Sequence, residues 1–275
     1  MRLFVVIDRQ LCNNSAAIET MQKRINTNIM DKYITRIGNF SFWKLSKENL
    51  FSLAEFVVKE NYAHHGVGVS TDEEIRAEVE MVYFEECLNY DNSAIIIAKD
   101  NNEAIVGTIR VMKWNGCTQL PLTKMFGDKL LQQEDLNLNA YEHKWHIGRF
   151  AVKKDIQDGK QSMTLFRILM VYAISPIFRY NDGVLFAECD KKLLKVMRLM
   201  RIEAHNMHDG IYYLGSETIP VYITRSGLTS FLLSNVALTL NNDVESGHEK
   251  EDQANNSERR AVIQDKAYIQ AAMVS

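Results

Sequence analysis

The sequence has few cysteines and none in a paired arrangement. The four are spread along the chain, with no C-x-x-C pair: Cys12, Cys87, Cys117 and Cys189. This spacing argues against a structural zinc site and against a redox dithiol. It favours free thiols in a reducing cytoplasm.

Four further absences narrow the function classes. Lys and Arg number 32 against 35 Asp and Glu, for a net charge of -3, so the basic face of a nucleic-acid-binding protein is not indicated. No apolar run approaches the roughly 20 residues that span a bilayer. The apolar start at 1–7 is shorter than a signal-peptide core and is followed directly by Asp8. Neither G-x-G-x-x-G nor a Walker A motif occurs. We therefore expect a soluble cytoplasmic protein that binds no nucleic acid and has no transmembrane segment.

What is present is typical of a globular protein. Apolar residues make up 46% and charged residues 24% of 275 residues, which suits one α/β domain with extensions. We divide the chain into a leader at 1–40, with a helix over 16–29, and a main domain at 41–237. A polar linker follows in 238–275, rich in Asn, Asp, Glu and Ser, with a helix over 261–273 that could dock on the domain or on a partner.

Hydrophobic periodicity and capping residues predict the elements of the main domain. Helices are expected over 47–62 with Ser46 as N-cap, from the capping box at Thr71 to about Leu88, and over 122–132, 162–178, 190–200 and 227–237. Strands are expected over 40–45, 93–98, 104–113, 143–152, 183–188, 212–214 and 221–224. Pro220 favours a strand start or an edge. This order predicts an α/β (α+β) fold, a mixed sheet with helices on its faces.

The strand over 143–152 carries two unusual side chains. Arg149 lies in an apolar run and needs a carboxylate or phosphate partner. That partner is either a ligand or a structural ion pair, for example with Glu188. His146 could act as a base near neutral pH or be a packed core residue. His143 and His146 point to opposite faces of a strand and cannot chelate one metal, so no metal site is expected. Because side chains alternate between the two faces of a sheet, His146 and Arg149 also lie on opposite faces unless a bulge intervenes.

Two segments beyond strand ends could contact ligands. The polar turn over 155–161 precedes a buried helix, whose first N–H groups favour anions such as coenzyme phosphates. An ordinary strand-to-helix loop with solvated lysines explains the same residues. Glu188, Cys189 and Asp190 end the next strand, where ligands of open α/β sheets bind. Asp190 reads more simply as a helix cap, and Cys189 as an inert thiol.

Two motifs resemble a known family. Gly107-Thr108-Ile109-Arg110 and Trp145-His146-Ile147-Gly148-Arg149-Phe150-Ala151-Val152 are similar to the Gly-Thr-x-Arg and Trp-Glu-x-Ser-Arg-Phe-x-Val elements of acyl-homoserine lactone synthases and N-acyl amino acid synthases. Both families belong to the GNAT superfamily, and the resemblance covers roughly 41–230. The chain has His146 in place of the acidic residue and Gly148 in place of the serine. The N-terminal Arg/Phe/Trp signature of lactone synthases is not evident.

The resemblance implies a GNAT acyl-CoA N-acyltransferase fold, with central parallel strands that splay apart around an acyl-pantetheine arm and a bulge that interrupts the first of them. Its backbone contacts would come from Phe150, Ala151 and Val152. Its phosphate would meet the loop over 153–161, with Lys153, Gly159, Lys160 and Gln161. Substrate would be bound by Arg110, Arg149 and Glu188. His146 would take the amine proton, and Tyr212 or Tyr213 would protonate the leaving thiolate.

The resemblance therefore predicts an N-acyltransferase. It would move a fatty acyl group from an acyl carrier protein or CoA thioester to the amine of an amino acid or similar small molecule. Two alternatives stay open at this point. One is a synthase that makes a lactone from S-adenosylmethionine, and the other is a non-catalytic GNAT-like module that binds an acyl carrier protein or another partner.

Overall fold

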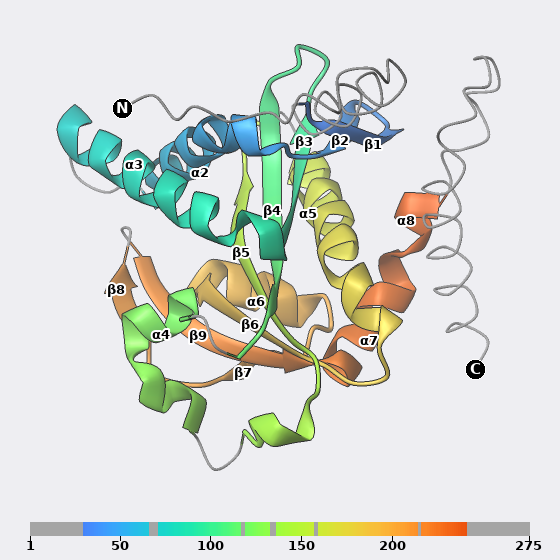
Figure 1. Ribbon diagram of the computed structural model, residues 1–275. Helices are drawn as coiled ribbons and strands as arrows, with labels where there is room; N and C mark the ends of the chain where they lie inside the picture. The colour runs from blue at the N-terminus through green and yellow to red at the C-terminus, as the bar shows by residue number, and fades with distance from the viewer. Residues whose placement is uncertain are drawn as a thin grey trace, which may run out of the picture.

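The computed structural model describes residues 30–65, 71–116, 119–132, 136–156, 159–213 and 216–240. The helices predicted over 16–29 and 261–273 lie outside them. In the described part, nine strands form one sheet in the order β1-β2-β3-β4-β5-β6-β9-β7, with β8 pairing β9 (Figure 1). The strands are β1 Lys32–Ile37, β2 Phe40–Lys44, β3 Ser93–Lys99, β4 Ile105–Trp114, β5 Lys144–Val152, β6 Val184–Asp190, β7 His205–Asn206, β8 Ile211–Tyr213 and β9 Ser216–Thr224. Only β5 and β6 pair in parallel among these described strands, so the mixed sheet predicted from the sequence is confirmed.

Helices cover both faces of the sheet. They are α2 Leu50–His65, α3 Asp72–Asn89, α4 Pro121–Phe126, α5 Gly159–Ile174, α6 Lys191–Leu199, α7 Arg225–Asn235 and α8 Ala237–Leu240. Side chains of α5, α6 and α7 share one core cluster with inward residues of the sheet. On the opposite face, α2 packs over β3 and β5, and α4 packs over β4 and β6. The molecule is therefore a three-layer arrangement around a central sheet.

The start of α3 and the start of α6 follow the predicted capping chemistry. The Thr71 side chain accepts from the N–H of Glu74, whose carboxylate accepts from the N–H of Thr71. Asp190 accepts from the N–H groups of Lys192 and Leu193. Each cap satisfies helix donors that have no partner within the helix.

Three local predictions were wrong in whole or in part. The helix expected over 122–132 is broken at Gly127, whose φ of 84° ends α4, and a 3-10 turn follows. Ser46 occupies the N-cap position as predicted, but its side chain makes no capping hydrogen bond, and the helix begins with a 3-10 turn over Lys47–Asn49. Pro220 lies inside β9, opposite Glu188. Its carbonyl accepts from Met207, so its missing N–H faces away from β6 and no bond of that ladder is lost.

Helix α5 is the centre of the core. With the 3-10 turn that continues it to Arg179, it is long and apolar enough to cross a membrane by length and composition alone. Here it packs on β3, β4 and β5, and many of its side chains are buried, among them Leu165, Ile168 and Leu169. Its apolar character is therefore explained by burial inside the protein.

The β5–β6 pair opens along its length. The parallel register runs from Lys144 opposite Val184 to Ile147 opposite Ala187 and ends there. Beyond this point β5 continues to pair only with β4 and β6 only with β9. The sheet therefore splays between its two central strands, as predicted.

Candidate active site

A cavity of about 620 Å³ passes through the sheet where β5 and β6 separate. Residues of α2, α3 and α4 line it on one face of the sheet, and residues of α5 and α6 line it on the other. Its volume is within the range of small-molecule sites. Because it reaches both faces, it can hold an extended ligand threaded between the two strands.

The part of the cavity under α5 and α6 is apolar. Its walls include Phe166 and Met170 of α5 and Leu193 and Met197 of α6. Phe150 packs edge-on against Phe166, with ring centroids 5.2 Å apart. The buried Cys189 also lines this part; burial, with Glu188 and Asp190 nearby, raises the pKa of its thiol. A protonated thiol in such surroundings is a poor nucleophile, which fits the inert reading.

A β-bulge at Arg149 brings the charged residues onto the opposite face. Arg110 pairs with Gly148 and Thr108 with Ala151, so β5 carries one residue more than β4 between these pairs. Arg149 has a φ of 53°, a left-handed conformation that costs a non-glycine residue about 1–2 kcal/mol. The extra residue cancels the alternation, so Arg149 faces α3 together with His146 rather than lying on the α5 side.

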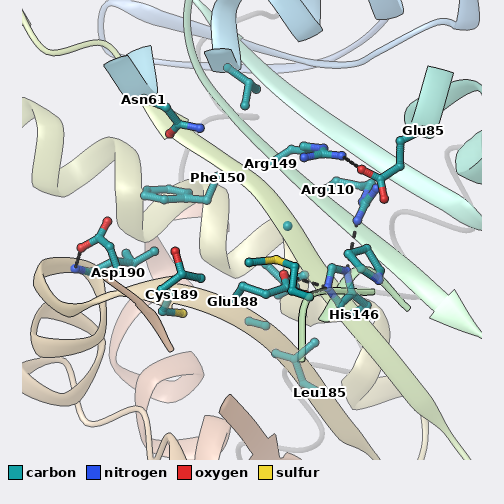
Figure 2. Close-up of a pocket in the computed structure, with 18 of the residues that line it drawn as sticks. Asn61, Glu85, Arg110, His146, Arg149, Phe150, Leu185, Glu188, Cys189 and Asp190 are labelled. Carbon is teal, nitrogen blue, oxygen red and sulfur yellow. Dashed lines mark hydrogen bonds and ion pairs between the residues drawn. The ribbon is translucent and has the colours of Figure 1, made fainter. Parts of the chain in front are cut away.

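Two adjacent carboxylates of α3, Glu85 and Glu86, hold the two arginines; Figure 2 shows Glu85 beside Arg149. Glu86 Oε1 accepts from Arg110 Nη1 at 2.6 Å and from Arg149 Nε at 2.7 Å, and Arg149 Nη2 also pairs with Glu85. Arg110 and Glu86 are fully buried. Burial by itself raises the pKa of Glu85, but Arg149, Lys124 and Arg110 outweigh it and hold that pKa below its usual range. The suggested partner of Arg149, Glu188, was therefore wrong.

His146 joins this cluster to Glu188. Its Nδ1 lies 3.1 Å from Arg110 Nη2, and its Nε2 lies 3.1 Å from both carboxylate oxygens of Glu188 (Figure 2). Burial alone would raise the pKa of Glu188, but the neighbouring His146, Arg110 and Arg149 lower it. Glu188 is thus ionised at neutral pH and lies at the cavity wall.

Some backbone N–H and C=O groups of β5 face the gap between β5 and β6. The N–H of Lys153 donates to Val106 of β4. Because backbone groups alternate along a strand, those of Ala151 also face β4, whereas those of Phe150 and Val152 face the gap. Consistent with this, the Val152 carbonyl meets the Nε2 of His64 at 2.8 Å. Of the three residues predicted to contact pantetheine, Phe150 and Val152 thus turn backbone groups toward the gap, and the Val152 carbonyl is already bonded to His64.

Other predicted site residues lie away from the cavity wall. The side chain of Tyr212 is 75% exposed on β8 and does not line the cavity. Lys154 contacts α2, through the Glu60 carboxylate and the Ala63 carbonyl. The other members of the predicted phosphate loop stand at the end of β5 or in the first turn of α5, outside the cavity lining: Lys153, Gly159, Lys160 and Gln161.

Sequence reasoning missed Glu85 and Glu86. A signal was present for the second, since Val79, Val82 and Glu86 share the buried stripe of α3. A carboxylate at a buried helical position requires a cationic partner. No group of three or more His, Cys, Asp or Glu side chains that could hold a metal occurs in the described part of the chain.

Comparisons with known proteins identify a family that the chain matches. A family model described as N-acyl amino acid synthase FeeM matches residues 55–211. No curated protein sequence matches the chain.

Three solved structures illustrate the likeness. TofI, in a ternary complex with an inhibitor and MTA, has a TM-score of 0.49 and 15% identity, covering 73% of this chain and 96% of its own. FeeM, an N-acyl amino acid synthase from uncultured soil microbes, has a TM-score of 0.46 and 14% identity, covering 75% and 99%. The AHL synthase LasI has a TM-score of 0.42 and 13% identity, covering 70% and 91%.

Proposed function

We infer the substrates of this enzyme from the premise that the chain belongs to the N-acyl amino acid synthase FeeM family. It is an N-acyltransferase of the GNAT superfamily. We propose that its donor is a fatty acyl thioester of acyl carrier protein or CoA, and that its acceptor is the amine of an amino acid or similar small molecule. The observation that carries the proposal is the cavity through the splayed sheet, which is apolar under α5 and α6 and charged under α3.

The donor would lie in the gap between β5 and β6. Backbone groups of Phe150 and Val152 face this gap and suit the amides of a pantetheine arm. The fatty acyl chain would pack among Phe166, Met170 and Leu193, where burial of each CH₂ group is worth about 0.8 kcal/mol. Lys153, Gly159, Lys160 and Gln161, at the end of β5 and the start of α5, would meet the phosphate.

The acceptor would bind on the charged side of the gap. Arg149 lines the cavity and is partly exposed, so its guanidinium suits the carboxylate of an amino acid. Arg110 is fully buried between Glu86 and His146, and it would therefore support the site without touching the acceptor. Glu188 lines the cavity, and it would face the acceptor amine as that amine approaches the thioester. A cytoplasmic location, where free thiols such as Cys87 and Cys189 persist, is part of the proposal.

A product assay tests the proposal. Purified protein is incubated with acyl-CoA or acyl-acyl carrier protein and a panel of amino acids, and products are identified by mass spectrometry with release of thiol. S-adenosylmethionine in the panel tests the lactone-synthase alternative, which would yield a lactone and not an N-acyl amino acid. Absence of transfer from every donor to every amine would contradict the proposal.

Two matched variants on α6 locate the acyl chain. Leu193 lines the cavity, whereas Leu199 on the same helix is exposed and outside it. Leu193→Trp fills the apolar end and should shift the preference toward shorter acyl donors, measured as kcat/KM across chain lengths. Leu199→Trp should keep the original preference. An unchanged preference in Leu193→Trp would place the acyl chain elsewhere.

A further inference from the structure

The hydrogen bonds of His146 fix the tautomer of its ring. An arginine guanidinium only donates, so Nδ1 of His146 must accept from Arg110 Nη2 at 3.1 Å. The ring proton of the neutral imidazole is then on Nε2, which donates to the Glu188 carboxylate at 3.1 Å. Both ring nitrogens are used, and the imidazole has no lone pair left for a substrate proton.

Arg110 cannot turn away to release the ring. It is fully buried, and its Nη1 is held by Glu86 at 2.6 Å. A proton on Nδ1 of His146 would point at the N–H of Arg110 Nη2, so two donors would face each other. The ring is 1% exposed, so water cannot separate them. With both ring nitrogens engaged by protein groups, no lone pair of His146 is directed at the substrate amine, the role expected from the sequence.

Gly148 belongs to the same arrangement. A Cβ at this position would lie 3.1 Å from Arg110 Nη2 and 3.2 Å from His146 Cε1. A serine at this position, as in the family pattern, would press on both groups that form the hydrogen bond. The two departures from the pattern, His146 and Gly148, are thus coupled by packing.

Glu188 has the properties that His146 lacks. It is the first residue of β6 beyond the part paired with β5, it lines the cavity, and its side chain is 14% exposed. A carboxylate offers about four acceptor positions. The single N–H of His146 cannot use all of them. Lone pairs remain for a group in the cavity.

We propose that Glu188 is a catalytic proton shuttle of the acyl transfer, and that His146 is a positioning residue fixed by Arg110. The inference rests on the proposed function. The neutral acceptor amine attacks the thioester carbonyl carbon and forms the C–N bond. Glu188 takes one proton from the nitrogen as it becomes positively charged. The C–S bond breaks, and Glu188 returns that proton to the thiolate sulfur, so the products are an amide and a free thiol.

The scheme accounts for the position of Tyr212. A carboxylate that collects the proton from nitrogen can deliver it to sulfur, so no separate acid is required. The Tyr212 side chain is 75% exposed and outside the cavity.

The electrostatic surroundings of Glu188 are mixed in sign. The charged and titratable groups of the elements around it are His146 and Arg149 on β5, Arg110 on β4, Glu85 and Glu86 on α3, Lys124 on α4, and Cys189 and Asp190 on β6. Of these groups, His146, Arg110 and Arg149 hold the pKa of Glu188 below its usual range, so Glu188 is ionised before attack, which a proton acceptor requires.

The test compares Glu188→Gln with Glu55→Gln, a surface control on α2 outside the cavity. Glu188→Gln keeps an oxygen that accepts from His146 but loses the charge. We expect kcat to fall about 10²–10⁴-fold, the usual contribution of general acid–base catalysis, with KM for the donor unchanged. Glu55→Gln should keep wild-type kcat. Activity of Glu188→Gln within about threefold of wild type would overturn the inference.

Chemical rescue separates a proton-transfer role from a structural one. In Glu188→Ala, added formate can enter the space left by the side chain and supply a carboxylate. We expect kcat of Glu188→Ala to rise with formate concentration, and kcat of Glu188→Gln, which leaves no such space, to stay constant. Failure of formate to raise the Glu188→Ala rate would count against the shuttle.

A pair of His146 variants separates positioning from catalysis. His146→Gln keeps one acceptor and one donor on its amide, and we expect it to recover part of the activity that His146→Ala loses. If His146 were the base, both variants would be equally inactive and Glu188→Gln would be active. A wild-type protein that transfers no acyl group would instead contradict the proposed function itself, an outcome distinct from activity retained in Glu188→Gln.

Discussion

The two halves of the β5–β6 pair differ sharply. From Lys144 to Ile147, β5 pairs with β6 in regular parallel register, and buried apolar side chains such as Phe186 cover the pair. From Gly148 onward the strands separate, and the side chains that face α3 are charged. The paired half is mainly apolar core, with only its residues next to the gap, such as His146 and Ala187, reaching the cavity, whereas the separated half forms the charged cavity wall. The difference shows that this sheet opens where an ion-pair cluster replaces apolar packing.

The bulge at Arg149 links the two halves. A left-handed residue in a strand is held only where its surroundings determine its conformation. Here Glu85 and Glu86 supply that restraint through the Arg149 guanidinium. The carboxylates of α3 therefore act on the shape of the sheet as well as on the charge of the site.

Removing the central carboxylate should have the largest effect. Glu86→Ala leaves Arg110 and Arg149 buried without their shared partner, and loss of one member of a buried ion pair costs about 3–5 kcal/mol. We expect the free energy of unfolding, measured by urea denaturation, to fall by this amount. Donor binding should weaken as well, because the bulge loses its restraint. A loss below about 1 kcal/mol would show that the cluster does not hold the bulge.

A variant in the paired half provides the matched comparison. Phe186→Ala removes a fully buried ring and should also cost about 3–5 kcal/mol. Under conditions where both proteins are folded, donor affinity should remain at the wild-type value in Phe186→Ala and fall only in Glu86→Ala. Equal loss of donor affinity in both would mean that the two halves do not differ in function.

Acid should weaken the charged half specifically. The pKa values of Glu85 and Glu188 in the folded protein are below 4.5, the usual value of a glutamate carboxyl. The unfolded chain therefore binds more protons in acid, and stability falls as pH drops below about 4.5 through the folded values. Urea denaturation across pH should show this fall, with a shallower slope in Glu85→Gln. The slope should be unchanged in Glu55→Gln, since Glu55 lies on the surface.

The rim of the cluster should matter least. Lys124 pairs with Glu85 at 3.2 Å, but its side chain is 47% exposed. An exposed pair of this kind contributes about 0–1 kcal/mol, so Lys124→Ala should change the free energy of unfolding by less than about 1 kcal/mol. A loss of unfolding free energy as large as that of Glu86→Ala would show that Lys124, at the protein surface, is an essential member of the cluster.

Much of the fold could be predicted from the sequence because its signals are local. The capping box at Thr71, the cap at Asp190 and the turn between β3 and β4 depend on residues a few positions apart. The helix α5 could be predicted from its apolar composition alone. The helix over 122–132 failed because the break at Gly127 depends on backbone conformation, which the apolar pattern does not reveal.

The site was predicted less completely. The sequence motif indicated Arg110, His146, Arg149 and Phe150, and all four line the cavity. It did not indicate their partners, because Glu86 is separated from Arg149 by 63 residues along the chain. Tyr212 was assigned by the resemblance alone, and its position on β8 depends on how the end of the sheet folds.

The sequence by itself determined the order of the elements, the caps at Thr71 and Asp190, and the strand that carries Arg149. These features follow from hydrophobic periodicity and from hydrogen bonds within a turn or two of the chain. Only the tertiary structure decided that β5 bulges, that Arg149 joins Glu85 and Glu86, and that both ring nitrogens of His146 are occupied. Each of these depends on buried charges that must find partners, and the partners come from segments that only folding brings together.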